Sequence, residues 1–394
     1  MTSLRRRTQL ALAAFILIPV AVVLSNLGTE ADEIRVAAVS NATSLLSEAP
    51  FDHSDRSNFM GARACIDCHR SEYVSWLNTA HYNNRANRFE GKETSIDTKY
   101  RAITGNTDLC YTCHSLPHEE RFGRRFVESG TSCESCHGAA GSETGWLNLH
   151  AVYGPNVTRM EHETLEHRSM RISRCEEAGM VRSERQYLIA KNCFSCHIVG
   201  DTNLIQAGHK SSFDSFSLIP YLLGEVRHNF HQDQRQNAKA PTLLTARQGV
   251  SPVLRVRMYF VVEQLARMHV ALTNIGRLPS EDDLDGAVAD SMLDIVDDAA
   301  GQLEEFAEVL LEEENTEGEV LTEDQVAALI AAVDIFTEFD DLDEQTRAAA
   351  TIAAQQVDLL ATEFEQLHDG EKLSVLDVEF LEDLGDPVGE ALKP

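Results

Sequence analysis

Eight of the nine cysteines in this sequence of 394 residues occur in four copies of one pattern, Cys-x-x-Cys-His. The copies comprise Cys65, Cys68 and His69; Cys110, Cys113 and His114; Cys133, Cys136 and His137; and Cys193, Cys196 and His197. Two thiols at this spacing can form thioethers with the two vinyl groups of one porphyrin, and the His that follows is then placed under the iron. The pattern predicts four covalently attached haems c, each with a proximal His ligand to its iron.

Other chemistry also uses paired cysteines. A single Cys-x-x-Cys occurs in redox dithiols and as half of a zinc site. Neither of these uses requires a His directly after the second Cys, whereas here the His follows in all four copies. The repeated His therefore favours haem attachment over both alternatives.

The second axial ligand of each iron is expected among the histidines outside the motifs. Three of these recur at nearly the same offset, because His81, His150 and His209 follow a motif His by 12, 13 and 12 residues. An ordinary surface or core role is the alternative for each. Which haem each His serves is left open, since a distal ligand can serve a haem attached to another motif.

The second motif has no distal His at this offset. His114 is followed by His118, which is too near in sequence to wrap around a haem plane. The haem of this motif is therefore the first candidate for an open iron position. The fourth distal ligand is expected at His228, with His231 and His53 as the next choices.

The N-terminus has the pattern of a secretory signal. Three arginines, Arg5 to Arg7, precede an apolar run from Leu10 to Leu24. This run is short for a membrane-spanning helix, which needs about 20 residues. Residues 1–27 are interpreted as a signal peptide or an N-terminal membrane anchor, followed by a linker over 28–55. Because bacterial c-type haems are attached outside the cytoplasm, we expect a periplasmic protein, either free or anchored to the inner membrane.

The predicted fold class is mainly α, in two domains. Residues 56–245 are expected to form a tetrahaem cytochrome c domain of short helices and loops wrapped around the haems. Only 18 residues separate His114 from Cys133, which predicts that the second and third haems are neighbours. Residues 251–394 have longer helical periods and predict an antiparallel bundle. Its helices are expected over Leu254–Asn274, from Ser280, over Thr322–Phe336, over Asp341–His368 and over Ser374–Leu384.

The charge of the chain is concentrated at its C-terminal end. Residues 281–394 hold 35 acidic and three basic residues, a net charge of −32, whereas the first 280 residues hold 28 acidic and 31 basic residues, a net charge of +3. This acidity argues against nucleic-acid binding and is compatible with a basic partner. The alternative is that the carboxylates solvate exposed helix faces.

Two further features have two interpretations each. Cys175, the ninth cysteine, is either a reactive thiol or a buried inert one. The five arginines between Arg168 and Arg185 either pair with haem propionates or a partner, or solvate a helix face.

The residues around the motifs resemble those of a known family. Trp76-x-x-Thr79-x-His81, Cys133 to Gly138 followed by Trp146-Leu147-x-x-His150, Ala207-Gly208-His209 and Arg227-His228-Asn229-Phe230 are similar to segments of multihaem cytochromes c. The resemblance is to the tetrahaem cytochromes that accept electrons from hydroxylamine oxidoreductase, and it covers residues 58–235. It implies mostly bis-His haems, stacked in pairs, that pass electrons without chemistry on a substrate. Ala139-Ala140 departs from the family pattern, which often has Pro there.

We expect an electron carrier that exchanges electrons with redox protein partners. The alternative is a multihaem oxidoreductase in which one haem has an open iron position and acts on a small nitrogen or sulfur compound. No catalytic acid or base is identified in the sequence. The carrier interpretation is preferred because three distal histidines follow a common pattern.

Overall fold

The computed structural model describes residues 58–83, 94–115, 117–119, 125–127, 130–141, 145–182, 184–211, 216–223, 252–278, 287–312, 344–368 and 370–373. All of these lie in a compact unit that spans residues 50–394. The expected signal or anchor (1–27) and linker (28–55) fall outside the described residues. Among the helices that are described, none is both long and apolar enough to cross a membrane.

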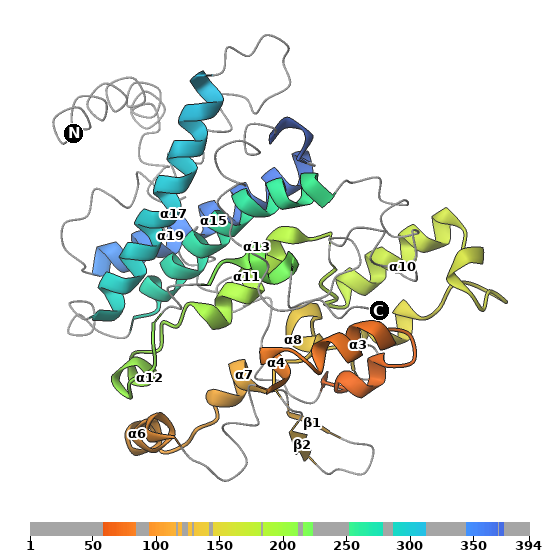
Figure 1. Ribbon diagram of the computed structural model, residues 1–394, viewed down its shortest axis with the longest axis horizontal. Helices are drawn as coiled ribbons and strands as arrows, with labels where there is room; N and C mark the ends of the chain where they lie inside the picture. The colour runs from red at the N-terminus through yellow and green to blue at the C-terminus, as the bar shows by residue number, and fades with distance from the viewer. Residues whose placement is uncertain are drawn as a thin grey trace, which may run out of the picture. The chain divides into compact units, whose positions relative to one another are not determined.

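Helices dominate the described part of the chain and confirm the predicted mainly α fold (Figure 1). The motif region has short elements: η2 (Ala62–Cys65), α3 (Arg70–Trp76), α4 (Ala80–Asn83), α6 (Ser95–Thr104), α7 (Cys110–His114), α8 (Cys133–His137), α9 (Trp146–His150), η3 (Met160–His162), α10 (Leu165–Glu177), α11 (Gln186–His197), α12 (Thr202–Gln206) and α13 (Leu218–Leu223). Strands β1 (Pro117–Glu119) and β2 (Arg125–Val127) pair antiparallel, with Pro117 opposite Val127. Longer helices follow: α15 (Pro252–Gly276), α17 (Ala287–Glu312) and α19 (Glu344–Leu367), then η4 (Glu371–Leu373).

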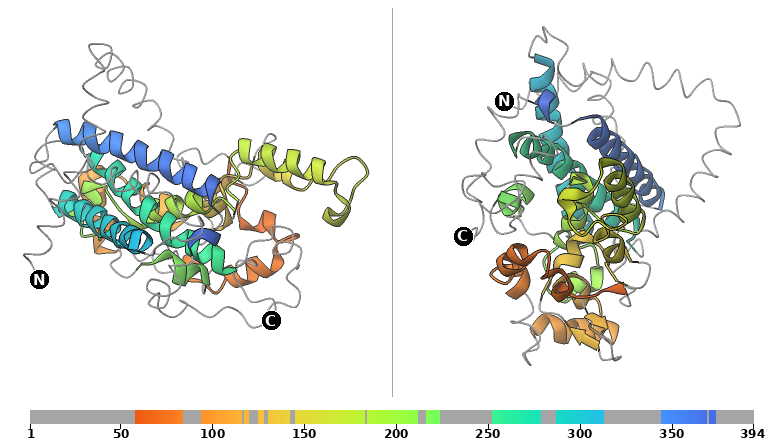
Figure 2. Two further views of the ribbon diagram at one scale, coloured as in Figure 1. Left: turned by 90° about the horizontal axis from the view of Figure 1, so that it is seen from above. Right: turned by 90° about the vertical axis from the view of Figure 1, so that its right-hand side faces the viewer.

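Helix α15 is the centre of the main hydrophobic core. Its apolar residues occur on all sides of the helix, a pattern typical of a fully buried helix. Met258, Val262, Leu265, Ala271 and Ile275 are each at most 2% exposed. Helices α17 and α19 lie along α15 (Figures 1 and 2), and both contribute to the same core.

These long helices run antiparallel to α15, as predicted. On α17, Phe306 meets Phe260 and Met292 meets Asn274, so the residue numbers rise in opposite directions. The same is true of α19, because Arg347 donates to Leu278 O near one end of α15 and Arg257 donates to Gly370 O near the other. The bundle interpretation therefore holds for the three long helices that are described.

An apolar stripe along one face of α17 is buried. Val288, Met292, Ile295, Ala299, Leu303 and Phe306 are each at most 8% exposed. The opposite face carries exposed carboxylates, from Asp290, Asp294, Asp297, Asp298, Glu304, Glu305 and Glu308. The predicted helices over Thr322–Phe336 and Ser374–Leu384 lie outside the described residues.

The helix that carries the fourth motif belongs to the same core as α15. Tyr187 on α11 is 1% exposed, and its hydroxyl donates to Asp358 Oδ1 on α19 over 2.9 Å. Lys191 forms an ion pair with the same carboxylate. The described helices on the two sides of residues 245–251 share one hydrophobic core. The predicted division into two domains at these residues stays a prediction.

His269 on α15 provides a test of this core through acid stability. Its Nδ1 bonds Ala354 O over 2.9 Å, and burial together with the charge of Lys191 lowers its pKa to about 4. In the unfolded chain the pKa returns to about 6.5, so the unfolded state binds the proton first as the pH falls. The contribution of neutral His269 to the free energy of unfolding is therefore fully present above pH 6.5. It is lost as the pH falls toward 4, which lowers the free energy of unfolding by up to about 3 kcal/mol.

We expect His269→Asn, which keeps a donor for Ala354, to remove this part of the acid sensitivity. Urea unfolding followed by circular dichroism at several pH values measures the difference from the wild type. The exposed His162→Asn serves as the control and should behave as the wild type does. Equal acid sensitivity in the wild type and the His269 variant would contradict the assignment.

Candidate functional site

Three of the four motifs form a single helical turn. Helices α7 and α8 consist of the second and third motifs alone, and the fourth motif is the last turn of α11 (Figure 1). The first motif begins at Cys65, the last residue of η2, and ends at His69, which directly precedes α3. A helical turn places residues three and four positions apart on one face, which brings the two cysteines and the His together.

Each of three motif histidines faces a histidine from outside the motifs. The ring centroids are 6.1 Å apart for His69 and His150, 6.3 Å for His197 and His81, and 6.3 Å for His114 and His209. These separations exceed that of stacked rings in van der Waals contact, and they are almost equal although the ring planes meet at 25°, 84° and 62°. What the three pairs share is therefore a distance and not a stacking geometry.

This distance fits two imidazoles on opposite sides of one iron. An imidazole nitrogen binds a first-row transition metal at about 2.0–2.1 Å and lies about 1.1 Å from its ring centre, so two such rings have centroids about 6.2–6.4 Å apart. All three pairs lie within or next to this range. The residues present thus suit a haem iron with two axial histidines.

The pairs join different motif regions. His81, which follows the first motif in sequence, faces His197 of the fourth, while His150 faces His69 and His209 faces His114. The equal offsets in the sequence therefore do not indicate which iron each His serves. His114 faces His209, 95 residues away in sequence, so the second motif has a histidine partner that the offset pattern did not indicate. The open iron position expected at this motif stays a prediction.

The remaining motif histidine, His137, is held by a backbone contact. Its Nδ1 lies 2.8 Å from Val181 O, an arrangement in which Nδ1–H donates and Nε2 is left to bind a metal. His209 has the same arrangement, with Nδ1 2.7 Å from Lys210 O. The candidate His228 lies outside the described residues, as do His231 and His53, so the fourth distal ligand stays a prediction.

Burial holds several of these rings in the neutral form that binds metals. It lowers the pKa of His197 to about 4, with a contribution from His81. The pKa of His150 is also lowered to about 4, by burial first and then by the neighbouring His69 and Arg171. Burial lowers the pKa of His137 as well.

The cysteines of the second, third and fourth motifs lie close together. The thiols of Cys113 and Cys196 are in hydrogen-bonding contact, which lowers the pKa of Cys196. Burial first, and then the nearby Cys196, raise the pKa of Cys136 to about 11. The pKa of Cys193 is raised well above its ordinary value, by burial first and then by the nearby Cys136. His137 of the third motif in turn interacts with His69 of the first.

Sequence reasoning missed the carboxylate that connects the first and third motifs. Glu134, the residue after Cys133, is 1% exposed and accepts hydrogen bonds from three backbone amides. Its oxygens lie 2.7 Å from Gly61 N, 3.0 Å from Met60 N and 2.8 Å from Ala140 N. A residue between two motif cysteines carries no sequence signal of this role, because its partners are main-chain groups.

Two other contacts position the paired histidines His197 and His81. The Phe216 ring stacks on His197 at 3.8 Å, and the α13 helix that follows it donates Leu218 N to the buried Glu263 over 2.9 Å. Gly130 packs against the backbone of His81, where a Cβ would lie 1.7 Å from His81 O. Its φ of 70° is in the region that favours glycine.

The ninth cysteine has the features of an inert thiol. Cys175 is 1% exposed, its Sγ lies 3.8 Å from Trp146 O, and burial raises its pKa.

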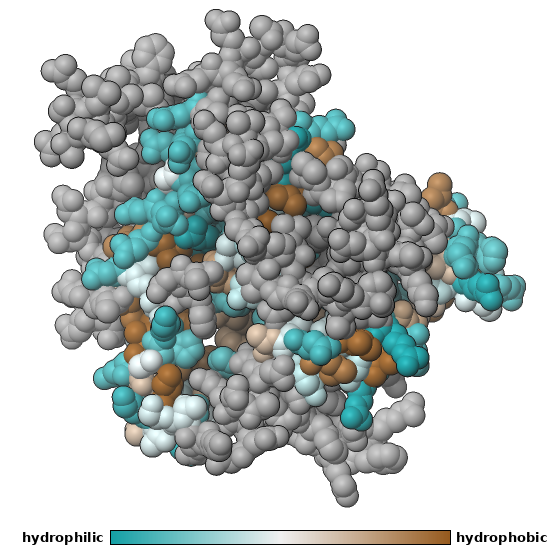
Figure 3. Space-filling model, in the orientation of Figure 1, coloured by the Kyte–Doolittle hydropathy of each residue, from teal (hydrophilic) through white to brown (hydrophobic). Residues whose placement is uncertain are grey.

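Apolar surface is exposed beside the first motif, where Met60 and Val74 are 46% and 43% exposed. Figure 3 shows hydrophobic residues on the surface around α3. A flat apolar group such as a porphyrin would cover surface of this kind.

Part of the chain matches the model of a known protein family. Residues 64–138 match the family model described as cytochrome c554 and c-prime, a segment that includes the first three motifs. The match supports a c-type cytochrome family, covalently bound haem c with iron, and a role in haem-based electron transfer. No curated protein and no solved structure matches the chain.

The pairing of His81 with His197 is testable in backgrounds that lack one haem. His81→Ala should leave the iron of the fourth motif with one imidazole, so electron paramagnetic resonance of the oxidised protein should gain a high-spin signal. In a Cys193→Ala/Cys196→Ala background, which cannot attach that haem, the same substitution should add none.

The matched control is a Cys65→Ala/Cys68→Ala background, in which His81→Ala should still add the high-spin signal. The reverse outcome, with the gain lost only in the first-motif background, would show that His81 serves its own motif.

Proposed function

We propose that this chain is an electron-transfer protein that carries four covalently attached haems c, most of them with two axial histidines. The observation that carries the proposal is the set of three histidine pairs at 6.1–6.3 Å, each of which joins a motif His to a His outside the motifs. The family match over residues 64–138 supports it independently. The fourth motif has the same Cys-x-x-Cys-His pattern but lies outside the matched segment.

The site residues have three roles. The eight motif cysteines form the thioethers, and His69, His114, His137 and His197 are the proximal ligands. His150, His209 and His81 are the distal ligands of the first, second and fourth haems, and His228 is the candidate for the third. When bound, each haem supplies one-electron redox chemistry at its iron.

Two axial histidines on one iron leave no position for a substrate, which favours a carrier over an oxidoreductase. The chain's own part is to hold both imidazoles of a pair in fixed places, so that the iron changes charge with little movement of its ligands. The buried rings of His150 and His197 are suited to this role, since their low pKa keeps them unprotonated.

The contacts between motifs support a continuous series of haems. His137 interacts with His69, Cys136 lies near Cys193 and Cys196, and Cys196 contacts Cys113. We infer that electrons pass among the motifs in the order first, third, fourth and second, or in reverse. The second and third motifs are also joined by Thr131, two residues before Cys133, whose hydroxyl donates to Cys113 O. In the inferred order, however, the fourth haem lies between the second and the third.

We further propose that the protein is exported to the periplasm, either free or held at the inner membrane by its N-terminal segment. The arginines and apolar run of residues 1–27 support this. Its partners are redox proteins, and the exposed carboxylates of α17 favour a basic surface on one of them.

The spin state of the oxidised protein tests the carrier function. We expect four haems per chain by haem quantification and four low-spin signals by electron paramagnetic resonance, because each iron has two protein ligands. Fewer than four haems per chain would show that at least one of the four motifs does not attach a haem. One high-spin haem would favour the oxidoreductase alternative, with nitrite, hydroxylamine and sulfur oxyanions as the first substrates to test.

The salt dependence of electron transfer tests the partner surface. With a basic c-type cytochrome as acceptor, the bimolecular rate should fall by roughly tenfold or more from low to high ionic strength, because attraction between opposite charges is screened. Replacing Asp290, Asp294 and Asp297 by Asn should weaken this dependence.

The matched control replaces Glu161, Glu166 and Glu177 by Gln, since these are exposed carboxylates in another part of the chain. An equal effect of the two triple variants would argue against a docking surface on α17.

A further inference from the structure

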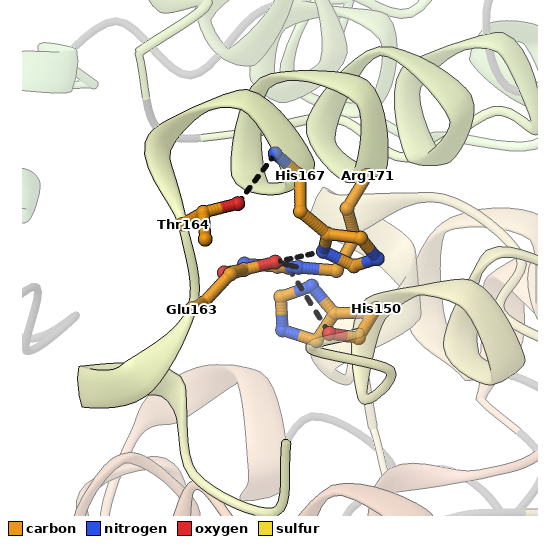
Figure 4. Close-up of polar contacts among 5 residues, drawn as sticks. All are labelled: His150, Glu163, Thr164, His167 and Arg171. Carbon is orange, nitrogen blue, oxygen red and sulfur yellow. Dashed lines mark hydrogen bonds and ion pairs between the residues drawn. The ribbon is translucent and has the colours of Figure 1, made fainter. Parts of the chain in front are cut away.

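The distal ligand His150 occupies the last position of a helix of only five residues. Helix α9 ends at His150, and the carbonyl groups in the last turn of a helix have no partner within it. One of them is bonded from another element, because Arg171 Nη1 of α10 donates to His150 O over 3.1 Å (Figure 4). The backbone of the ligand residue is therefore fixed from outside its own helix.

Arg171 is itself held in place by a carboxylate. Its Nε and Nη2 each lie 2.7 Å from an oxygen of Glu163, a bidentate pair that leaves Nη1 directed at His150 O (Figure 4). The side chains of Arg171 and Glu163 are 6% and 0% exposed. His167 Nδ1 adds a third contact to Glu163 at 2.7 Å. The guanidinium therefore has one fixed orientation.

The ring of His150 is held by other residues. The Trp146 ring meets it edge to face with centroids 6.0 Å apart, and His69 lies opposite at 6.1 Å. Ring and backbone of the ligand are thus fixed by separate groups. Since a buried ion pair is weak evidence for stability by itself, the geometry of this one calls for a more specific role.

We propose that Arg171, oriented by Glu163, is a positioning residue that holds His150 on the iron of the first motif, and that Glu163 balances the charge of the guanidinium at that haem. The proposal rests on the proposed function, since it requires that His150 is an iron ligand. The sequence alone does not indicate that Arg171 positions His150, because Arg171 contacts the main-chain carbonyl of His150.

Two substitutions separate geometry from charge. Arg171→Lys keeps the positive charge but cannot form the fork that both grips Glu163 and reaches His150 O. We expect cyanide, added to the oxidised protein, to displace His150 about tenfold faster or more, as the loss of a charge-assisted hydrogen bond predicts. The rate is read from the absorbance change of one haem in four.

Glu163→Gln has a different expected result. It leaves the charge of Arg171 unbalanced beside the haem, which favours the reduced state, so the reduction potential of that haem should rise. A role limited to joining α9 and α10 would not change the potential in this direction. The controls are Arg174→Gln and Glu166→Gln, exposed residues of α10, which should leave both the cyanide rate and the potential at the wild-type values.

His150→Gly separates failure of this inference from failure of the proposed function. If the function is correct, this variant has one high-spin haem that binds cyanide at once. If it gains no high-spin haem, the assignment of His150 as a ligand fails, and with it the basis of the inference. If it does, but Arg171→Lys binds cyanide at the wild-type rate and Glu163→Gln leaves the potential unchanged, only the positioning role is overturned.

Discussion

The constant separation between paired imidazoles is the constraint on which the motif region depends. Each pair joins two short elements from distant parts of the chain, and none of the helices that end in His114, His137 or His150 is longer than one or two turns. Helices of this length are not stable alone in water. Their places must therefore be set by contacts outside themselves, which explains why buried polar groups such as Glu134 bond to main-chain amides of other segments.

Two different kinds of packing support the four motifs. The fourth motif ends a helix that is buried against α15 in the main hydrophobic core, so its position follows from apolar contact. The first three depend more on hydrogen bonds between separate segments, such as the one that Trp76 Nε1 of α3 donates to Thr131 O at 2.7 Å. The acidic C-terminal helices are consequently not an appendage to the motif region, because α15 and α19 hold the helix that carries Cys193, Cys196 and His197.

Local patterns in the sequence predicted local features of the structure. The motifs follow from fixed spacing, and the buried stripe of α17 follows from helical periodicity. The pairing of histidines could not be predicted, since it depends on the path of loops whose residues have no periodic signal. The contacts of Glu134 with Met60, Gly61 and Ala140 and that of Arg171 with His150 O were missed for a related reason. These contacts are made to backbone groups, and a backbone group looks the same at every position of a sequence.

The three histidine pairs are also interleaved along the chain. Each segment between paired residues contains one member of each of the other two pairs, as in His69–His150, which encloses His81 and His114. Closing any one of these long loops alone costs about 4 kcal/mol of chain entropy. Once His69 and His150 are joined, however, the free path between His81 and His197 is shorter by about half, so each closure lowers the entropic cost of the next. Bringing the three pairs together is thereby a cooperative property of residues 69–209, and no shorter fragment contains all three pairs.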